Sequence, residues 1–185
     1  MHVLEKFKYC PVCGSKHFVE QSEKSKRCES CGFEYFLNPS SAIAAFIMND
    51  KGELLVTRRK FDPGRGTLDL PGGFCDIGET IEEALAREVE EETNLIIKEK
   101  HYFCSLPNKY RYSGFDIPTL DTFFVCKVED EAKLRPADDV AEAVWTPLKD
   151  IHTEQFGLRS IRQALHDFLQ RHTVKSPRHT EYLKK

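Results

Sequence analysis

The chain has 185 residues, with 27 lysines and arginines against 30 acidic residues, and its formal net charge is −3. Hydrophobic residues make up 40% and aromatic residues 11%, which is enough for a folded core and argues against a wholly disordered chain. The longest apolar run, residues 42–48, is far shorter than the roughly 20 residues of a membrane-spanning helix. The near-neutral charge argues against a dedicated nucleic-acid binder. The length allows one domain, or one domain with a small satellite.

The seven cysteines indicate a compartment and a chemistry. The first ten residues carry Glu5, Lys6 and Lys8 and contain no apolar stretch typical of a signal peptide, so we expect a cytoplasmic, reducing location. In such a location, cysteines serve as metal ligands or buried apolar residues more often than as disulfides.

Two Cys-x-x-Cys pairs lie in the first 31 residues: Cys10, Cys13, Cys28 and Cys31. They supply four thiolates for a closed tetrahedral zinc site that has no open position for a catalytic water. The arrangement resembles a zinc ribbon, and we expect one over residues 1–37, because so short a segment cannot fold by apolar burial alone. With six Lys or Arg and five Glu, this segment shows no basic surface, so a structural or docking role is expected.

A short linker at residues 38–41 precedes the larger part of the chain. The hydrophobic pattern then predicts, in chain order, strands at 42–48 and 53–59, a loop at 61–69, a helix at 80–93, strands at 95–106, 119–128 and 141–146, and a helix at about 155–172. This order predicts an α/β domain over residues 38–172, built as a sandwich around a mixed sheet. Residues 173–185 are expected to form a basic, frayed tail.

The helix predicted at 80–93 has recognisable ends. Thr80 can cap its first turn, and Glu83, three residues later, completes a capping box. Asn94 follows the helix, where a residue with positive φ is commonly needed.

Three carboxylates of this helix, Glu88, Glu91 and Glu92, are spaced i, i+3 and i+4 and therefore share one face. Like charges so placed repel one another, and a site for hard divalent cations such as Mg²⁺ explains why they are there. Arg87 can pair with Glu83 or Glu91 and hold carboxylates in place. Gly72 and Gly73, before the helix, allow close backbone approach and can present a carbonyl to a metal.

This part of the chain resembles the Nudix box, the loop-helix signature of a hydrolase family. The residues that carry the resemblance are Gly73, Glu79 and the run from Arg87 to Leu95. Asn94 stands where the family has glycine. The similarity extends through residues 70–73 and 145–148. It implies a Nudix-type α/β/α sandwich and hydrolysis, dependent on Mg²⁺ or Mn²⁺, of a nucleoside diphosphate linked to another moiety.

The resemblance also implies roles for residues. Glu88 and Glu92 would be the principal metal ligands, Glu91 would assist, and the carbonyl of Gly72 or Gly73 would complete the coordination. Glu79 and Arg87 would orient these ligands. The general base stays open between Glu88 and a later loop with Asp138 and Asp139; a solvated turn is the competing interpretation of those two aspartates.

A zinc ribbon before a Nudix domain is similar to the organisation of NADH pyrophosphatases. The aromatic motif of that subgroup is replaced here by residues 105–112, so ADP-ribose and nucleotide sugars stand beside NADH as expected substrates. Arg58 or Arg59 could contact phosphate, and Tyr110, Tyr112 or Phe115 could stack on a base, although packing is the competing role for each aromatic residue. Of these, Arg58 and Tyr112 are taken as the candidate contacts. A homodimer is common in the family. The alternative function is a ligand sensor or nucleic-acid-binding regulator that has lost its chemistry.

Overall fold

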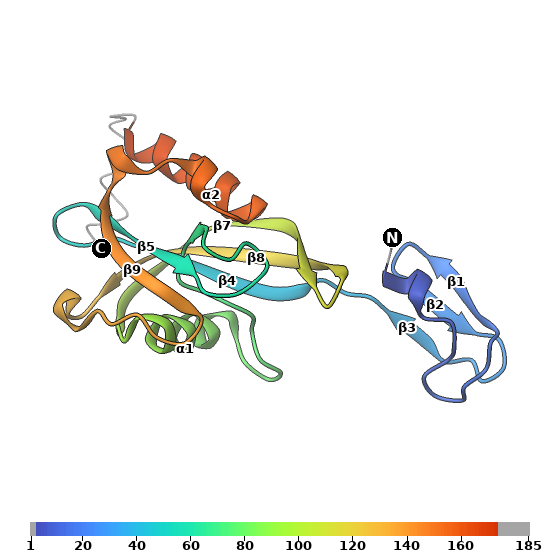
Figure 1. The fold of residues 1–185 in the computed structure, drawn as a ribbon. Coiled ribbons are helices and arrows are strands. Elements are labelled where there is room, and N and C mark those ends of the chain that lie inside the picture. Colours follow the sequence, from blue (N-terminus) through green and yellow to red (C-terminus); the bar gives the residue numbers. More distant parts are fainter. Residues whose placement is uncertain (1–2, 174–185) are drawn as a thin grey trace.

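A computed structural model describes residues 3–173. Its N-terminal part consists of a 3-10 turn and a three-stranded antiparallel sheet in the order β1-β2-β3; the bounds are η1 Val3–Lys6, β1 Phe18–Ser22, β2 Ser25–Cys28 and β3 Glu34–Phe36. Cys10, Phe18 and Cys28 form its small buried cluster. Figure 1 shows this part as a lobe joined to the rest of the chain by the segment between β3 and β4.

The larger part contains six strands, two α-helices and short 3-10 turns: β4 Ser40–Ile47, β5 Glu53–Arg59, β6 Leu68–Asp69, α1 Ile81–Thr93, β7 Ile97–Tyr112, β8 Phe115–Val128, η2 Glu131–Lys133, β9 Val140–Pro147, η3 Leu148–Asp150, η4 Thr153–Gln155 and α2 Arg159–Thr173. One sheet has the order β4-β8-β7, with β4 parallel and β7 antiparallel to β8. The other, β6-β5-β9, is antiparallel. The predicted mixed sheet is confirmed.

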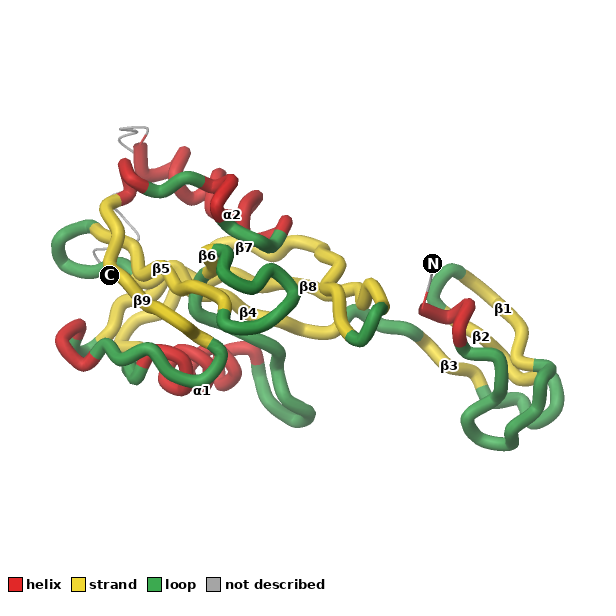
Figure 2. Tube along the Cα trace, viewed as in Figure 1, coloured by secondary structure: helices red, strands yellow, loops and turns green. Residues whose placement is uncertain are grey.

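The alternation of side chains along β4 places one helix on each face of its sheet. Ile43, Ala45 and Ile47 belong to the cluster that buries Leu85 and Val89 of α1. Ala44 and Phe46 belong to the cluster of α2, where the rings of Phe46 and Phe168 stack with centroids 4.3 Å apart. Burying a side chain of this size contributes about 1.5–3 kcal/mol. Figures 1 and 2 show α1 and α2 on opposite sides of the strands, which is the expected α/β/α sandwich.

The β7–β8 hairpin is longer than predicted, because residues 107–112 continue β7 and residues 115–118 begin β8, beyond the predicted strands at 95–106 and 119–128. Ser113 and Gly114 have φ of 48° and 82°, which fits the two-residue turn that right-twisted hairpins favour. Pro107 is tolerated because β7 is an edge strand, and Pro118 because β4 begins to pair with β8 only at Thr119.

Other boundaries also differ from the predictions. β4 begins at Ser40, so the linker is shorter than residues 38–41. The second helix begins at Arg159, and residues 153–155 form a 3-10 turn before it. The expected basic tail lies outside the described residues, apart from residue 173. Within the part of the chain that the structure describes, no helix has the length and apolar character required to cross a membrane.

The ends of α1 are as predicted. Thr80 Oγ1 accepts a hydrogen bond from the Glu83 backbone N–H at 3.2 Å, and Glu83 accepts one from the Thr80 backbone N–H at 2.8 Å. Asn94 ends the helix with φ of 59° and donates its backbone N–H to the Glu90 carbonyl. These caps fix where the acidic face of α1 begins and ends.

Candidate active site

A cavity of about 370 Å³ opens between the two sheets and α1. Its lining includes nine carboxylates and four basic side chains: Asp62, Asp69, Asp76, Glu88, Glu91, Glu92, Asp121, Asp138 and Asp139, with Arg58, Arg59, Lys60 and Arg87. The predicted metal ligands and both later aspartates therefore share one cavity, although 46 residues separate Glu92 from Asp138.

The glycine loop, residues 70–73, is held against β4 by backbone hydrogen bonds. The backbone N–H of Ile43 donates to the carbonyl of Gly73 at 2.9 Å, and the N–H of Ala45 donates to that of Pro71 at 2.8 Å. A Cβ at Gly72 would lie 2.2 Å from the Ile43 carbonyl oxygen, and one at Gly73 would lie 2.5 Å from Glu88 Oε1. Gly72 therefore requires glycine, because the clash is with backbone, whereas a side chain at Gly73 would displace the Glu88 carboxylate. Because the Gly73 carbonyl is occupied, Gly72 is the better of the two predicted carbonyl ligands.

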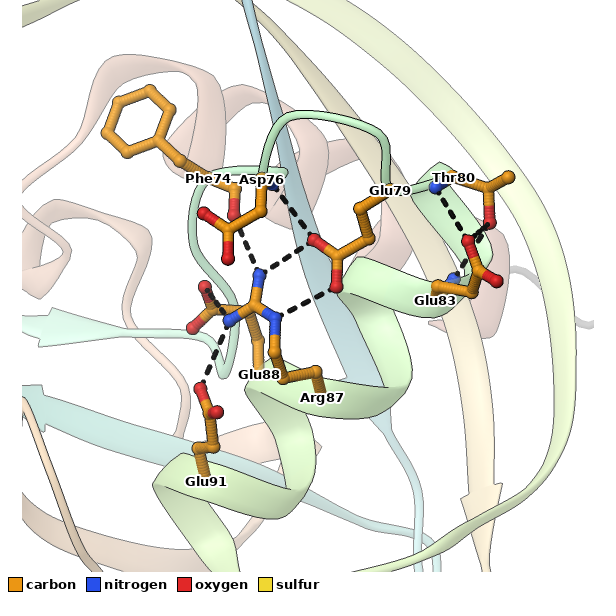
Figure 3. A network of polar contacts seen from close by, with 8 residues as sticks. All are labelled: Phe74, Asp76, Glu79, Thr80, Glu83, Arg87, Glu88 and Glu91. Atoms are coloured by element: carbon orange, nitrogen blue, oxygen red, sulfur yellow. Dashed lines mark hydrogen bonds and ion pairs between the residues drawn. The ribbon is translucent and has the colours of Figure 1, made fainter.

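Arg87 is the centre of a polar network on α1 (Figure 3). Its Nε and Nη2 donate to the two oxygens of Glu79 at 2.8 and 2.9 Å, and Nη2 also reaches the Phe74 carbonyl at 3.1 Å. Its Nη1 donates to Glu88 at 2.9 Å and to Glu91 at 3.0 Å. The predicted pairing with Glu91 is confirmed, whereas the alternative with Glu83 is wrong, because Glu83 completes the capping box.

The three carboxylates on α1 point to different partners. Glu92 Oε2 accepts the backbone N–H of Gly72 at 2.9 Å, whereas Glu88 and Glu91 bind Arg87. Among the described residues, only the four ribbon cysteines bring three or more ligand atoms within 4.8 Å of one another. The carboxylates thus line one wall without converging on one point.

Burial controls the ionisation of this wall. It raises the pKa of Glu92 to about 8, and the charges of Glu88, Asp69 and Asp139 act in the same direction. Burial also raises the pKa of Glu88, against the favourable effect of Arg87. In contrast, the hydrogen bonds from Arg87 and the Asp76 backbone lower the pKa of Glu79 to about 2. A buried carboxyl with a raised pKa gains most from a nearby cation.

Asp138 and Asp139 lie on the loop before β9, and Lys60 connects this loop to β5. Lys60 Nζ donates a hydrogen bond to the backbone carbonyl of Asp138 at 3.0 Å. The backbone N–H of Lys60 donates to the backbone carbonyl of Asp139 at 2.9 Å. Asp138 has a positive φ of 49°. The two aspartates are exposed and lie in a turn, as the solvated-turn interpretation expects, and they also line the cavity with Glu88 and Glu92.

The two predicted substrate contacts lie in different places. Arg58 lines the cavity, although its guanidinium already binds Glu142 at 3.0 Å and the Gly66 carbonyl at 2.8 Å. Tyr112 is 61% exposed at the end of β7, and Tyr110 lines the cavity instead. By alternation Tyr110 and Tyr112 share one face of β7, so what separates them is that Tyr112 is the last residue of the strand and lies beyond the cavity.

The sequence reasoning also missed a buried pair on the other wall. Arg59 Nη1 and Asp69 Oδ2 lie 2.5 Å apart, and Arg59 Nη2 donates to the Tyr110 hydroxyl at 3.0 Å. Arg59 thereby connects β5, β6 and β7. A basic residue beside a buried strand was the available signal, but the sequence does not identify its acidic partner.

In the N-terminal lobe, the four cysteines gather as the ribbon prediction requires. Cys10 Sγ lies 3.7 Å from Cys31 Sγ, and Cys13 Sγ lies 3.6 Å from Cys28 Sγ. Four sulfurs at about 2.3 Å from one zinc would lie roughly 3.8 Å apart, so the geometry fits the metal. Burial acts to raise the pKa of Cys28, but backbone hydrogen bonds from Cys31 and Ser30 lower it to about 6, whereas burial and hydrogen bonds with the neighbouring cysteines raise the pKa of Cys13 and Cys31.

Fold and site together define a class, the α/β/α sandwich proteins in which a glycine loop and an acidic helix form one cavity. The family model described as the NUDIX domain matches residues 38–168, and the model described as the NADH pyrophosphatase zinc ribbon domain matches residues 5–36. The chain therefore belongs to the Nudix family and carries a zinc ribbon of the NADH pyrophosphatase type.

Known relatives agree with this assignment. An ADP-ribose pyrophosphatase from Methanocaldococcus jannaschii is 44% identical over 117 residues, which are 62% of this chain and 66% of that protein. A NAD-capped RNA hydrolase NudC from Haemophilus influenzae is 35% identical over 109 residues, which are 57% of this chain and 40% of that protein. The chain thus spans less than two thirds of these relatives.

A solved structure shares the fold. The crystal structure of a NUDIX hydrolase from Nitrosomonas europaea matches with a TM-score of 0.70 and 22% identity, over 88% of this chain and 90% of that chain. At this identity, the match concerns the fold alone.

Proposed function

We propose that the protein is a pyrophosphohydrolase, dependent on Mg²⁺ or Mn²⁺, that cleaves a nucleoside diphosphate linked to another moiety. ADP-ribose is the first candidate substrate, followed by NADH and nucleotide sugars. The observation that carries this proposal is the wall of Glu88, Glu91 and Glu92 beside Gly72 in one cavity. The 44% identity to an ADP-ribose pyrophosphatase supports the choice of substrate.

The donor set fits a hard divalent cation, because it consists of carboxylate oxygens and a backbone carbonyl. Glu88, Glu91, Glu92 and the Gly72 carbonyl would hold the ion, and no hydrogen bond to that carbonyl is found in the described part of the chain. When bound, the cation neutralises charge on the diphosphate and lowers the pKa of a water molecule.

The protein groups around this wall have complementary tasks in the proposed reaction. Arg87 holds Glu88 and Glu91 by its Nη1 hydrogen bonds. Lys60 lines the cavity close to the Asp138 loop and would attract the negatively charged diphosphate. Asp138, Asp139 or Glu88 would accept the proton of the attacking water, because all three line the cavity.

The test is hydrolysis of a panel comprising ADP-ribose, NADH, a nucleotide sugar, a dinucleotide and a nucleoside triphosphate during a Mg²⁺ titration. We expect phosphate-ester products whose formation follows Mg²⁺ concentration, with ADP-ribose preferred. Glu88→Gln and Glu92→Gln should each lose most turnover and still fold. Glu90→Gln is the matched control, because Glu90 is exposed on α1 and does not line the cavity.

Two results would contradict the proposal. Near-normal hydrolysis by Glu88→Gln or Glu92→Gln would refute the metal site. Binding of the panel compounds without turnover would instead identify the ligand sensor.

Two further parts of the proposal concern the whole chain. A cytoplasmic location is supported by its seven cysteines, all of which are free. A structural zinc in the ribbon is supported by the clustered sulfurs.

A further inference from the structure

The cavity has a second wall that the proposed hydrolysis does not use. It is formed by Asn108 and Tyr110 of β7 and by Thr119 and Asp121 of β8. Asn108 and Thr119 are direct neighbours in the β7–β8 register. Because a diphosphate and its metal ions would occupy the acidic wall in the proposed reaction, this second wall would be available to another part of the substrate.

Asp121 connects the side chains of this second wall through hydrogen bonds. It is 7% exposed and accepts three hydrogen bonds from neutral donors: Thr119 Oγ1 at 2.6 Å, Asn108 Nδ2 at 2.9 Å and Ser160 Oγ at 2.5 Å. No ion pair of Asp121 is found within residues 3–173. Because a carboxylate can only accept hydrogen bonds, Asp121 orients the Asn108 amide with Nδ2 toward itself and Oδ1 away.

The rest of the Asn108 amide is left for a ligand. An amide carries two hydrogens on Nδ2 and an acceptor oxygen, and only one hydrogen is used by Asp121. Among the described residues, no donor to Asn108 Oδ1 is found. The partly exposed side chain therefore offers the cavity an acceptor next to a donor in one plane.

This pair of groups is complementary to adenine. An asparagine amide binds adenine in a bidentate way, accepting from the exocyclic amino group and donating to the adjacent ring nitrogen. Hypoxanthine carries an oxygen in place of that amino group, so two acceptors would face each other. The amide thus distinguishes the two bases although their shapes are nearly the same.

Aromatic rings stand next to the amide. Tyr110, two residues along the same face of β7, contacts Phe74 edge to face with centroids 5.2 Å apart. Arg59 holds the Tyr110 hydroxyl, and Figure 3 shows the ring of Phe74 directed away from the Arg87 network. A flat base paired with Asn108 would therefore find an aromatic surface beside it.

We propose that Asn108 recognises the amino edge of an adenine base and that Asp121 is the positioning residue that orients it. The inference rests on the proposed function for the diphosphate, and it adds the base that the substrate carries. It predicts a preference for ADP-ribose over the otherwise identical inosine diphosphate ribose. One bidentate pair gives a preference on the order of 10- to 100-fold.

The experiment compares kcat/KM for these two substrates and, separately, the calorimetric affinities for AMP and IMP, which need no turnover. We expect both ratios to favour adenine in the wild-type protein and to fall below about 3-fold in Asn108→Ala. Lys109→Ala is the matched control, because Lys109 is exposed and lies outside the cavity; it should keep the preference.

Asp121 is tested by a pair of variants. Asp121→Ala should lose the preference, whereas Asp121→Asn should retain it because its amide oxygen still accepts from Asn108. A merely structural role would lower the melting temperature without changing the ratio of the two substrates. If Asp121→Ala does not fold, Asn108→Ala decides the question.

The outcomes separate this inference from the proposed function. Equal affinities for AMP and IMP in the wild-type protein, no measurable binding of either, or an unchanged ratio in Asn108→Ala would refute adenine recognition even if both diphosphates are hydrolysed. Selective AMP binding without hydrolysis of either diphosphate would refute the proposed function and support the base site.

Discussion

Arg87 and Glu79 face each other in a parallel, two-pronged pair, with Nε to Oε1 at 2.8 Å and Nη2 to Oε2 at 2.9 Å. The pair fixes the plane of the guanidinium and leaves Nη1 for Glu88 and Glu91. Because only arginine offers this fork of donors, Glu79 indirectly controls where the carboxylates of α1 lie.

Arg87→Lys should therefore lower turnover, even though the positive charge stays. A lysine ammonium cannot bind Glu79 and Glu88 in the same geometry, so we expect a loss of roughly 10- to 100-fold in kcat or in apparent Mg²⁺ affinity, the range typical of residues that orient metal ligands. Steady-state rates during a Mg²⁺ titration measure both.

Glu79→Gln should produce a similar loss, because a neutral amide cannot accept both bonds from Arg87. Glu83→Gln serves as its control, since glutamine can still complete the capping box. If Glu79→Gln and Glu83→Gln have equal activities, Arg87 does not act through Glu79.

The raised pKa of Glu92 predicts a dependence of stability on pH. Burial raises this pKa from 4.5 to about 8, so between these values the folded protein holds a proton that the unfolded chain has lost. The folded state then binds more protons, and this group's contribution to stability is present below pH 4.5 and lost as the pH rises to about 8. In metal-free protein, Glu92→Gln should flatten this decline in melting temperature.

The same ionisation should control metal binding. Mg²⁺ requires the carboxylate, so the increase in melting temperature caused by Mg²⁺ should be larger at pH 8.5 than at pH 6. Thermal unfolding at both pH values, with and without Mg²⁺, checks this expectation. An increase that is equal at both pH values would mean that Glu92 does not ionise when the metal binds.

The acidic wall could be predicted from sequence because its parts are local. Glu88, Glu91 and Glu92 share a face by helical spacing alone, and Thr80 and Asn94 mark the ends of their helix. The second wall could not be predicted, because Asn108 and Asp121 meet only through the register of a hairpin whose strands contain Pro107 and Pro118. Local breaker residues argue for a loop there, but the edge position of β7 removes the penalty of Pro107, and Pro118 precedes the part of β8 that pairs with β4.

The two-pronged partner of Arg87, Glu79, was also not predicted from the sequence. Glu79, Glu83 and Glu91 all lie within eight residues of it, and helical spacing favours the last two. Glu83 is already used by Thr80, and the turn before α1 brings Glu79 back toward Arg87 instead. Whether a glutamate caps the helix or pairs with Arg87 therefore depends on contacts that helical spacing alone does not determine.

Gly73→Ala should reduce activity through Glu88. The new methyl would lie 2.5 Å from Glu88 Oε1, so the carboxylate would have to move away from Arg87. We expect a loss in kcat/KM of about 10-fold or more, with a small change in melting temperature because Glu88 is a flexible side chain.

A double-mutant cycle isolates that cause. In a Glu88→Gln background whose activity is already low, Gly73→Ala should cost much less than it does alone, because both changes affect one carboxylate. Fully additive losses would show that the methyl disturbs the loop by another route.

Removal of zinc should unfold the N-terminal lobe and spare the rest. Its sheet shares no strand with the two others, and in the described part of the lobe the buried apolar residues are Val3, Leu4, Cys10, Phe18 and Cys28. Burial of so few residues cannot offset the entropy lost when the segment becomes ordered, and zinc binding has to supply the missing free energy.

Cys28→Ser should therefore abolish zinc binding and raise amide exchange in β1–β3, while α1 and α2 stay protected. Elemental analysis and hydrogen exchange measure the two effects, with Cys104→Ser of β7 as the control that keeps both zinc and protection. Loss of protection in α1 as well would mean that the Nudix domain depends on the ribbon for its stability.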